Sequence, residues 1–282
     1  MSISLKNQIE KKSDSYSRIQ KKLASYLIRY WNEIPLMSIE TIARETGVST
    51  ATISRFAQLF DYKGFYDFKD RIKEEIKTAI NPVDRFRKLK TDVSGKNPLV
   101  NVARQDVKNI NKLIEMIKEE TFKDLVNRIR NSNRVFSFGT SISSIFASLI
   151  RYIFNQVQME AHCLDEGNVS VEEKIATLRE GDLIIFCSFF PYSKSTIDFA
   201  QLAYEQELEV VAISDNEYSP ISKYSHLVLP IPRENILFTT SISALSVLIN
   251  AIATEIAYHR KEDLTKSIKE TDKILKRFYF LS

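Results

Sequence analysis

The sequence after Asn131 contains five short apolar runs, RVFSF, MEAHCL, DLIIFCSF, EVVAIS and HLVLPI, which are separated by segments of helical length. This alternation is typical of a parallel sheet in which a helix crosses over from each strand to the next. The run DLIIFCSF is apolar on both faces, as a central parallel strand should be. The pattern predicts a doubly wound α/β domain built on a five-stranded parallel sheet.

The first 80 residues have a different pattern. Apolar residues recur every three or four positions from Ser17 to about Trp31, and again after Gly64, which predicts amphipathic helices in both places. Because these residues have helical periodicity and contain no strand-like apolar run, we predict an all-helical domain over residues 1–80.

Residues 81–98 contain two Asn-Pro pairs, a Ser-Gly pair and a run of charges, which indicates a linker. Helical periodicity then resumes at Leu99 and continues to Arg130, with a break predicted near Thr121. We therefore assign the α/β domain to residues 99–282.

The helical domain contains the motif SIETIARETGVSTATISRF, which has the form helix, glycine turn, second helix. Ser38 is placed to cap the first of these helices and Gly47 to end it, while Ser49 is placed to cap the second, which is predicted to end near Phe60. Ala43 is small at a position where the two helices must approach. This arrangement predicts a helix-turn-helix.

The predicted second helix presents short polar side chains and one arginine, which suits insertion into the major groove of DNA. Arg55 is placed to bind a guanine edge, and Thr50 and Ala51 to contact base edges or a thymine methyl group. Ser49, Thr52 and Ser54 are placed to hold phosphates. The alternative is an ordinary helical hairpin in which these side chains only cap the helix and contact water. The predicted DNA-binding residues are Ser49, Thr50, Ala51, Thr52, Ser54 and Arg55.

Charge is distributed unevenly along the chain. Residues 1–131 carry 26 Lys and Arg against 17 Asp and Glu, a net charge of +9, whereas residues 132–282 carry 14 against 19, a net charge of −5. A basic half that contains a helix-turn-helix favours double-stranded DNA as its partner.

Two hydroxyl-rich loops follow strands of the predicted sheet, GTSISS after RVFSF and SFFPYSKST after DLIIFCSF. Ligands of open α/β sheets bind beyond the carboxyl ends of the strands, and a helix N-terminus favours an anion there. Gly139 permits a tight turn, Ser144 and Ser195 add hydroxyls, and Lys194 adds positive charge. The loops predict a site for a phosphate with a polar body, although capping and packing alone would also explain serines there. The predicted ligand-binding residues are Ser141, Ser143, Ser188, Ser193 and Thr196.

The segments ATISRFAQLFDYKGFYDFK, GTSIS and SFFPYSKST resemble the RpiR/MurR transcriptional regulators, which join a helix-turn-helix domain to a sugar isomerase (SIS) domain. The resemblance covers nearly the whole chain. It implies a SIS fold for the C-terminal domain, a phosphosugar as effector, an operator in double-stranded DNA as target, and assembly as a homodimer or homotetramer.

The chain departs from this family in both loops. The first loop of SIS domains reads Gly-x-Gly-x-Ser, so Ser141 replaces the second glycine. The second often reads Ser-x-Ser-Gly-x-Thr or Ser, so Phe190 replaces a serine and Pro191 a glycine. Phe190 removes a hydroxyl and Pro191 an amide donor. A phosphosugar is the leading expectation, and a changed or lost ligand is the alternative.

Two other functions are compatible with these motifs. A SIS domain without an effector would serve only for dimerisation. A sugar-phosphate isomerase would need a general base near the substrate carbons. The residues that could serve as this base are Glu166, Glu234, Glu255 and His226. The spacing of these residues in the sequence distinguishes none of them, so we expect no enzymatic activity.

The remaining features are those of an ordinary chain of the cytoplasm, because the first 25 residues carry no secretory signal. The stretch Asn235–Thr254 has no charge, but eight of its 20 residues are Asn, Thr or Ser, so we expect a buried helix rather than a membrane span. Cys163 and Cys187 lie in apolar segments and are expected to be small buried side chains. The three histidines are scattered, so neither a metal site nor a cofactor is predicted.

Overall fold

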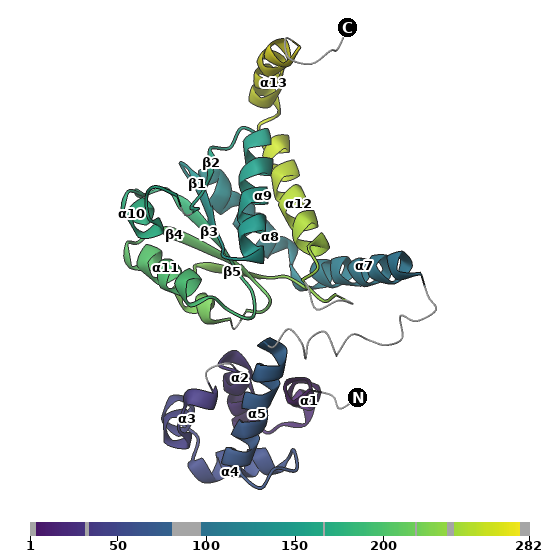
Figure 1. The fold of residues 1–282 in the computed structure, drawn as a ribbon, viewed down its shortest axis with the longest axis vertical. Helices are drawn as coiled ribbons and strands as arrows, with labels where there is room; N and C mark the ends of the chain where they lie inside the picture. Colours follow the sequence, from purple (N-terminus) through teal and green to yellow (C-terminus); the bar gives the residue numbers. More distant parts are fainter. Residues whose placement is uncertain are drawn as a thin grey trace. The chain divides into compact units, whose positions relative to one another are not determined.

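The computed structural model describes residues 4–31, 34–80, 97–165, 167–217, 219–235 and 240–276, which form two compact units (Figure 1). One is the helical N-terminal part, and the other contains the sheet. Of the predicted linker, residues 81–96 lie outside the described residues. Asn97 caps the next helix by accepting a hydrogen bond from the Leu99 amide at 3.0 Å, and Pro98 occupies its first turn.

The N-terminal unit consists of helices only. They are α1 (Leu5–Lys11), α2 (Arg18–Arg29), α3 (Ile39–Thr46), α4 (Thr50–Gln58) and α5 (Phe65–Ile80), with 3₁₀ turns η1 (Ser13–Ser15) and η2 (Ile34–Leu36). The four helices predicted from periodicity are confirmed. The short helix α1 was not predicted, because its seven residues include only two that are buried, Leu5 and Ile9.

The two helices of the helix-turn-helix begin and end where the sequence predicts. The Ser38 hydroxyl accepts a hydrogen bond from the Thr41 amide at 3.1 Å, and the Ser49 hydroxyl accepts one from the Thr52 amide at 3.2 Å. Gly47 ends α3 with φ of 63°, a left-handed conformation that costs glycine little. These caps fix where α3 ends and where α4 begins.

An aromatic core holds the helical unit together. The ring centroids of Phe56 and Phe60 are 5.4 Å apart, and those of Phe56 and Phe68 are 6.4 Å apart. Ile42 of α3 and Ile53 of α4 are also fully buried. Each such side chain contributes about 1.5–3 kcal/mol through burial, so this core positions α4 firmly and leaves its other face exposed.

The second unit is built on the predicted five-stranded parallel sheet. Its strands are β1 (Val135–Phe138), β2 (Ala161–Cys163), β3 (Leu183–Ser188), β4 (Glu209–Ser214) and β5 (Leu227–Pro230). They lie in the order β2-β1-β3-β4-β5, and every neighbouring pair is parallel. The strand order reverses between β1 and β3, so the topological switch point of the sheet lies at the carboxyl ends of these two strands.

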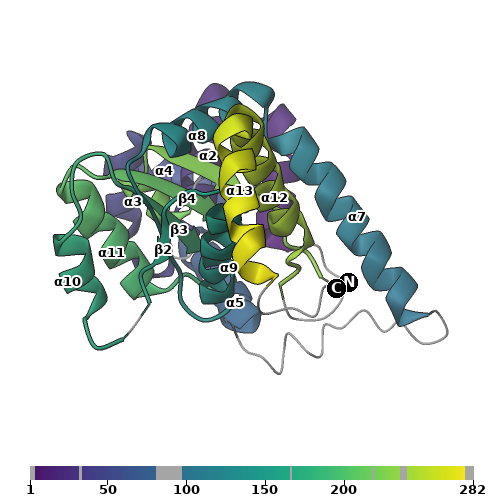
Figure 2. The same cartoon turned by 90° about the horizontal axis from the view of Figure 1, so that it is seen from above.

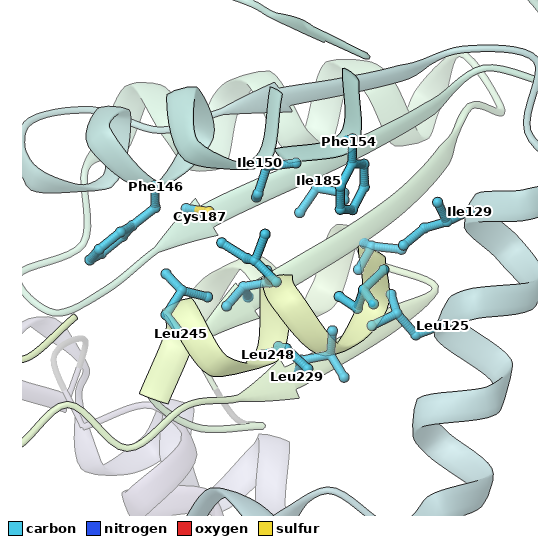
Figure 3. Close-up of a cluster of buried hydrophobic side chains, with 14 of the residues drawn as sticks. Leu125, Ile129, Phe146, Ile150, Phe154, Ile185, Cys187, Leu229, Leu245 and Leu248 are labelled. Atoms are coloured by element: carbon cyan, nitrogen blue, oxygen red, sulfur yellow. The ribbon is translucent and has the colours of Figure 1, made fainter. Parts of the chain in front are cut away.

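Helices cover both faces of the sheet (Figures 1 and 2). The helices are α7 (Pro98–Met116), α8 (Glu119–Asn131), α9 (Ile142–Gln156), α10 (Val171–Ala176), α11 (Lys194–Glu205), α12 (Ser243–His259) and α13 (Lys261–Leu275), with the 3₁₀ turn η4 (Pro220–Tyr224). Helices α8, α9 and α12 pack on one face, and α10 and α11 on the other. Figure 3 shows the first of these cores, where Phe154 of α9 and Leu248 of α12 approach Ile185 of β3.

Two helix boundaries differ from the prediction. The break predicted near Thr121 lies at Ile117 and Lys118, because Ile117 takes an extended conformation and α8 begins at Glu119. The uncharged helix begins at Ser243 rather than near Asn235. Among the described residues no helix has the length and apolarity that a membrane crossing requires.

Both cysteines carry free thiols. Cys187 lies in the core beside α9 and Cys163 is half-buried, and burial raises the pKa of both thiols. Both thiols are therefore protonated at neutral pH.

Candidate functional sites

The exposed face of α4 carries most of the predicted DNA-binding residues. Thr50, Ala51 and Arg55 are exposed, whereas Val48 and Ile53 on the opposite side are buried. No carboxylate of the described chain forms an ion pair with the Arg55 guanidinium. Arg55 is therefore available for an external partner.

The small hydroxyl side chains at the start of α4 have a local role. Besides capping the helix, the Ser49 hydroxyl lies 2.9 Å from the Thr52 hydroxyl. Thr52 and Ser54 are half-buried rather than exposed as predicted, because each lies beside the buried stripe of α4. Of these three residues, only Ser49 is exposed at the N-terminus of the helix.

The two hydroxyl-rich loops meet at the switch point of the sheet. Gly139 and Thr140 follow β1 and lead into α9, while residues 189–193 follow β3 and lead into α11. The Thr140 hydroxyl lies 3.4 Å from the Thr196 hydroxyl in the first turn of α11, so the two loops are in contact. The N-termini of α9 and α11 both lie at this switch point, where their helix dipoles favour an anion.

The first loop is tightly constrained. A side chain at Gly139 would lie 2.6 Å from the Cβ and carbonyl oxygen of Ser143, so only glycine fits there. Ser141 is exposed and has φ of 55°, and its carbonyl oxygen accepts a hydrogen bond from the Ser144 hydroxyl at 2.7 Å. Ser143 is buried behind it. Of the two predicted serines here, Ser141 faces solvent and Ser143 packs against the turn.

The second loop supplies one hydroxyl with no partner. Ser188 is the last residue of β3 and only 3% exposed, and its hydroxyl forms no hydrogen bond with the described residues. Buried hydroxyls are rarely left unpaired. Ser193 is half-buried with its hydroxyl 2.8 Å from that of Ser195, and Thr196 is buried. Lys194 points away into an ion pair with Asp198 at 2.6 Å.

A cluster of polar side chains beside the second loop was missed by the sequence reasoning. The Tyr192 hydroxyl donates a hydrogen bond to Asp215 Oδ1 at 2.9 Å, and Arg233 Nη2 lies 3.4 Å from Asp215 Oδ2. Burial, with the Asp215 carboxylate beside it, raises the pKa of Tyr192. Asp215 directly follows β4, so the rule that identified the loops after β1 and β3 could have identified it too.

The candidate bases of an isomerase do not gather at these loops. His226 precedes β5 at the opposite end of the sheet, where its Nδ1 accepts a hydrogen bond from the Val210 amide at 3.1 Å. Glu255 lies in the last turns of α12, 3.1 Å from His259. Glu234 is exposed and 3.8 Å from Lys112, and Glu166 lies outside the described residues. Among the described residues, no group of three His, Cys, Asp or Glu side chains could hold a metal ion.

Two family models match this chain. A model for the helix-turn-helix domain of the rpiR family matches residues 3–79, and a model for the SIS domain matches residues 128–255. The chain belongs to the RpiR family. As an RpiR-family chain it has the organisation of HTH-type transcriptional regulators that carry a SIS domain, which confirms the family and the fold class predicted from its motifs.

Relatives of this RpiR-family chain match either both units or the SIS domain alone. An HTH-type transcriptional regulator of Clostridium perfringens is 24% identical over 273 residues, which cover 95% of this chain and 98% of the relative. The sugar isomerase domain of an RpiR transcription factor from Sphaerobacter thermophilus is 24% identical with a TM-score of 0.60, covering 63% of this chain and 99% of that structure. NanR of Vibrio vulnificus, solved in complex with ManNAc-6P, is 19% identical with a TM-score of 0.60, covering 98% of this chain and 99% of that one. These structural likenesses show the fold.

Proposed function

We propose that this protein is a cytoplasmic regulator that binds an operator in double-stranded DNA through its helix-turn-helix and senses a sugar phosphate with its SIS domain. It acts as a homodimer or homotetramer. The sugar phosphate shifts the protein between states of different affinity for DNA, which requires that it bind those states unequally. The domain boundaries that we propose are residues 1–80 and 99–282, with a linker between them.

The observation that carries the ligand proposal is the contact between the two loops at the switch point. Thr140 and Thr196 join the loops at 3.4 Å, and the buried hydroxyl of Ser188, the last residue of β3, has no partner among the described residues. The N-termini of two helices, α9 and α11, lie at this switch point and favour a phosphate group over a neutral sugar. The proposed ligand-binding residues are Ser141, Ser143, Ser188, Ser193 and Thr196.

An enzymatic role is not proposed. Isomerisation requires a base within hydrogen-bond reach of the substrate. His226 and Glu255 lie at the other end of the sheet from the loops, Glu234 is exposed beside Lys112, and the Asp215 carboxylate is held by Tyr192 and Arg233. We therefore propose that the SIS domain binds its sugar phosphate without turning it over. Turnover of a hexose or pentose phosphate by the purified protein would contradict this.

Thermal unfolding with a panel of sugar phosphates, including ManNAc-6P, tests the ligand proposal. A ligand at 100 times its Kd stabilises the folded state by about 2.7 kcal/mol, which raises the melting temperature. We expect Ser188→Ala and Ser143→Ala to reduce the shift. Ser225→Ala is the control, because its hydroxyl donates to Ile221 within its own turn at 2.9 Å. Absence of a shift with every sugar phosphate would favour a SIS domain that only dimerises.

Arg55→Ala tests the DNA-binding proposal. If Arg55 binds a guanine edge, its loss should weaken binding to the operator by about 1–3 kcal/mol and binding to random DNA much less. The operator is found by selection from a random duplex library, and affinities are measured by fluorescence anisotropy at constant salt. Arg151→Ala, an exposed arginine of α9, is the control. An equal loss on both kinds of DNA would reject base recognition by Arg55.

A further inference from the structure

The second ligand loop is attached to the ends of two neighbouring strands by a polar cluster. We call Tyr192, Asp215, Asn216 and Arg233 the Tyr192 cluster. The Tyr192 hydroxyl donates to Asp215 Oδ1 at 2.9 Å and accepts from Asn216 Nδ2 at 3.0 Å, while Arg233 lies 3.4 Å from the other Asp215 oxygen. The cluster thus joins residues that follow β3, β4 and β5.

The cluster is sheltered from solvent. The side chains of Asp215 and Arg233 are only 19% and 21% exposed. The guanidinium of Arg233 lies over the ring of Phe189, 6.0 Å from its centroid. The loop is therefore held on both sides of Phe190 and Pro191, by Phe189 before them and by Tyr192 after them. Hydrogen bonds that involve charged groups in such partly buried places are stronger than neutral ones.

The cluster also reaches the candidate ligand residue at the end of β3. The Ser214 hydroxyl donates to the Ser188 carbonyl oxygen at 2.6 Å and lies 3.3 Å from Asp215 Oδ1. Because Asp215 directly follows Ser214 in the chain, it is connected through Ser214 to the backbone of Ser188, whose own hydroxyl has no partner in the described chain. A change in the position of Asp215 would move the backbone that carries this hydroxyl.

On its other side the cluster is connected to α7. Arg233 Nη1 lies 3.3 Å from the Thr240 hydroxyl, and the Ser241 amide donates to the Arg233 carbonyl oxygen at 3.2 Å. The Ser241 hydroxyl in turn donates to Asp106 Oδ1 of α7 at 2.7 Å.

A second bond joins α7 to the same segment. Asn109, which is buried at 2% exposure, donates through its side-chain amide to the Glu234 carbonyl oxygen at 2.7 Å. Asp106 and Asn109 lie one turn apart on α7, so both hold the segment that carries Arg233. In the sequence, α7 is the first described helix after the helix-turn-helix unit.

We infer that Asp215 and Arg233 are positioning residues of the second ligand loop and connect it, through Ser241 and Asp106, to α7. The inference rests on the proposed function. The cluster holds in place the loop from which Phe190 and Pro191 remove a hydroxyl and an amide donor. A ligand on Ser188 and Thr196 stabilises one arrangement of this chain of contacts, and α7 passes the change to the segment that leads to the helix-turn-helix unit.

Hydrogen exchange of the full-length protein without ligand tests the connection. Ser241→Ala removes the bond to Asp106 at one end, and amide exchange at Phe189, Phe190, Tyr192 and Ser193 should accelerate at least threefold. Ser225→Ala, whose hydroxyl is outside the cluster, should leave these rates unchanged. In the reverse direction, Tyr192→Phe should accelerate exchange at residues 105–110 of α7, and Tyr204→Phe should not. Unchanged exchange rates both in the second loop of Ser241→Ala and at residues 105–110 of Tyr192→Phe would overturn the inference.

Ligand binding separates this inference from the proposed function. With ManNAc-6P and inorganic phosphate as probes, Tyr192→Phe should raise the Kd about tenfold, the loss expected for one hydrogen bond near a charged group. Ser241→Ala should leave that Kd within twofold but reduce, at least threefold, the ratio of operator affinities with and without ManNAc-6P. An unchanged ratio would overturn the coupling role. If neither probe binds wild-type protein, the proposed ligand class fails, while the exchange experiment still decides the connection.

Discussion

Ser141 adopts φ of 55° and ψ of −127° at the turn between β1 and α9, a conformation that favours glycine. Strain of this kind costs about 1–3 kcal/mol, and a glycine would lose about 0.5–1 kcal/mol more backbone entropy on folding. Ser141→Gly should therefore raise the free energy of unfolding of the α/β unit by about 1 kcal/mol. Urea unfolding should show a higher midpoint with an unchanged slope.

The control for this substitution is a serine three residues later. Ser144 lies inside α9, where its hydroxyl holds the turn. Ser144→Gly should lower the midpoint, because glycine is unfavourable within a helix. A lower midpoint for Ser141→Gly as well would show that the turn is not strained.

Individual residues of the ligand loops differ in how well the sequence predicts them. Ser188 follows an apolar run and precedes a helical one, so its place at the carboxyl end of a strand is predictable. The sequence does not predict that Tyr192 contacts Asp215, because 23 positions separate them and only the order of β3 and β4 brings them together. The loop positions are therefore predictable, whereas their partners from other strands are not.

At the scale of elements, capping residues and apolar spacing predict the helix-turn-helix well. Ser38, Gly47 and Ser49 act locally, and each acts as expected. The start of α12 is predicted eight positions too early, because Asn235 begins the uncharged stretch whereas the helix itself begins at Ser243. A charge-free composition thus indicates burial but does not fix where a helix begins.

Strand β1 is joined to β3 at its start by an ion pair whose removal has a predictable cost. Arg134 binds Asp182 through two bonds of 3.0 and 2.5 Å, and the Asp182 side chain is only 2% exposed. Burial alone would raise the pKa of Asp182, but hydrogen bonds from Arg134 and from the Arg179 amide outweigh it and lower that pKa. Breaking a buried pair costs 3–5 kcal/mol, and because Arg134 is one-third exposed we expect Arg134→Met to cost about 2 kcal/mol at pH 7.

The pH dependence checks the cause of this loss. A carboxyl whose pKa is lowered by folding contributes stability above its unfolded pKa of about 3.9, and this contribution is lost as pH falls through the folded value. The difference between wild type and Arg134→Met in urea unfolding should thus be largest above about pH 5 and shrink below pH 4. Lys123→Met, which breaks an exposed pair with Glu119, should cause no resolvable change at any pH. The Arg134 guanidinium also lies over the ring of Phe136, 5.1 Å from its centroid, so a pH-independent loss would assign the effect to this packing instead.

At the scale of the whole molecule, the described residues form separate hydrophobic cores in the two units. Phe56 lies in the core of the helical unit and Phe154 in the core shared by α9 and the sheet, and no residue belongs to both. Each ring is fully buried, so replacing either by alanine should cost about 3–5 kcal/mol in its own unit.

We expect calorimetry to show two unfolding transitions, with Phe56→Ala lowering the temperature of one and Phe154→Ala that of the other. Because the proposed ligand binds only the α/β unit, a sugar phosphate should still raise the transition that Phe56→Ala leaves unchanged. A single transition lowered by both substitutions would mean that the units unfold together and would contradict this prediction.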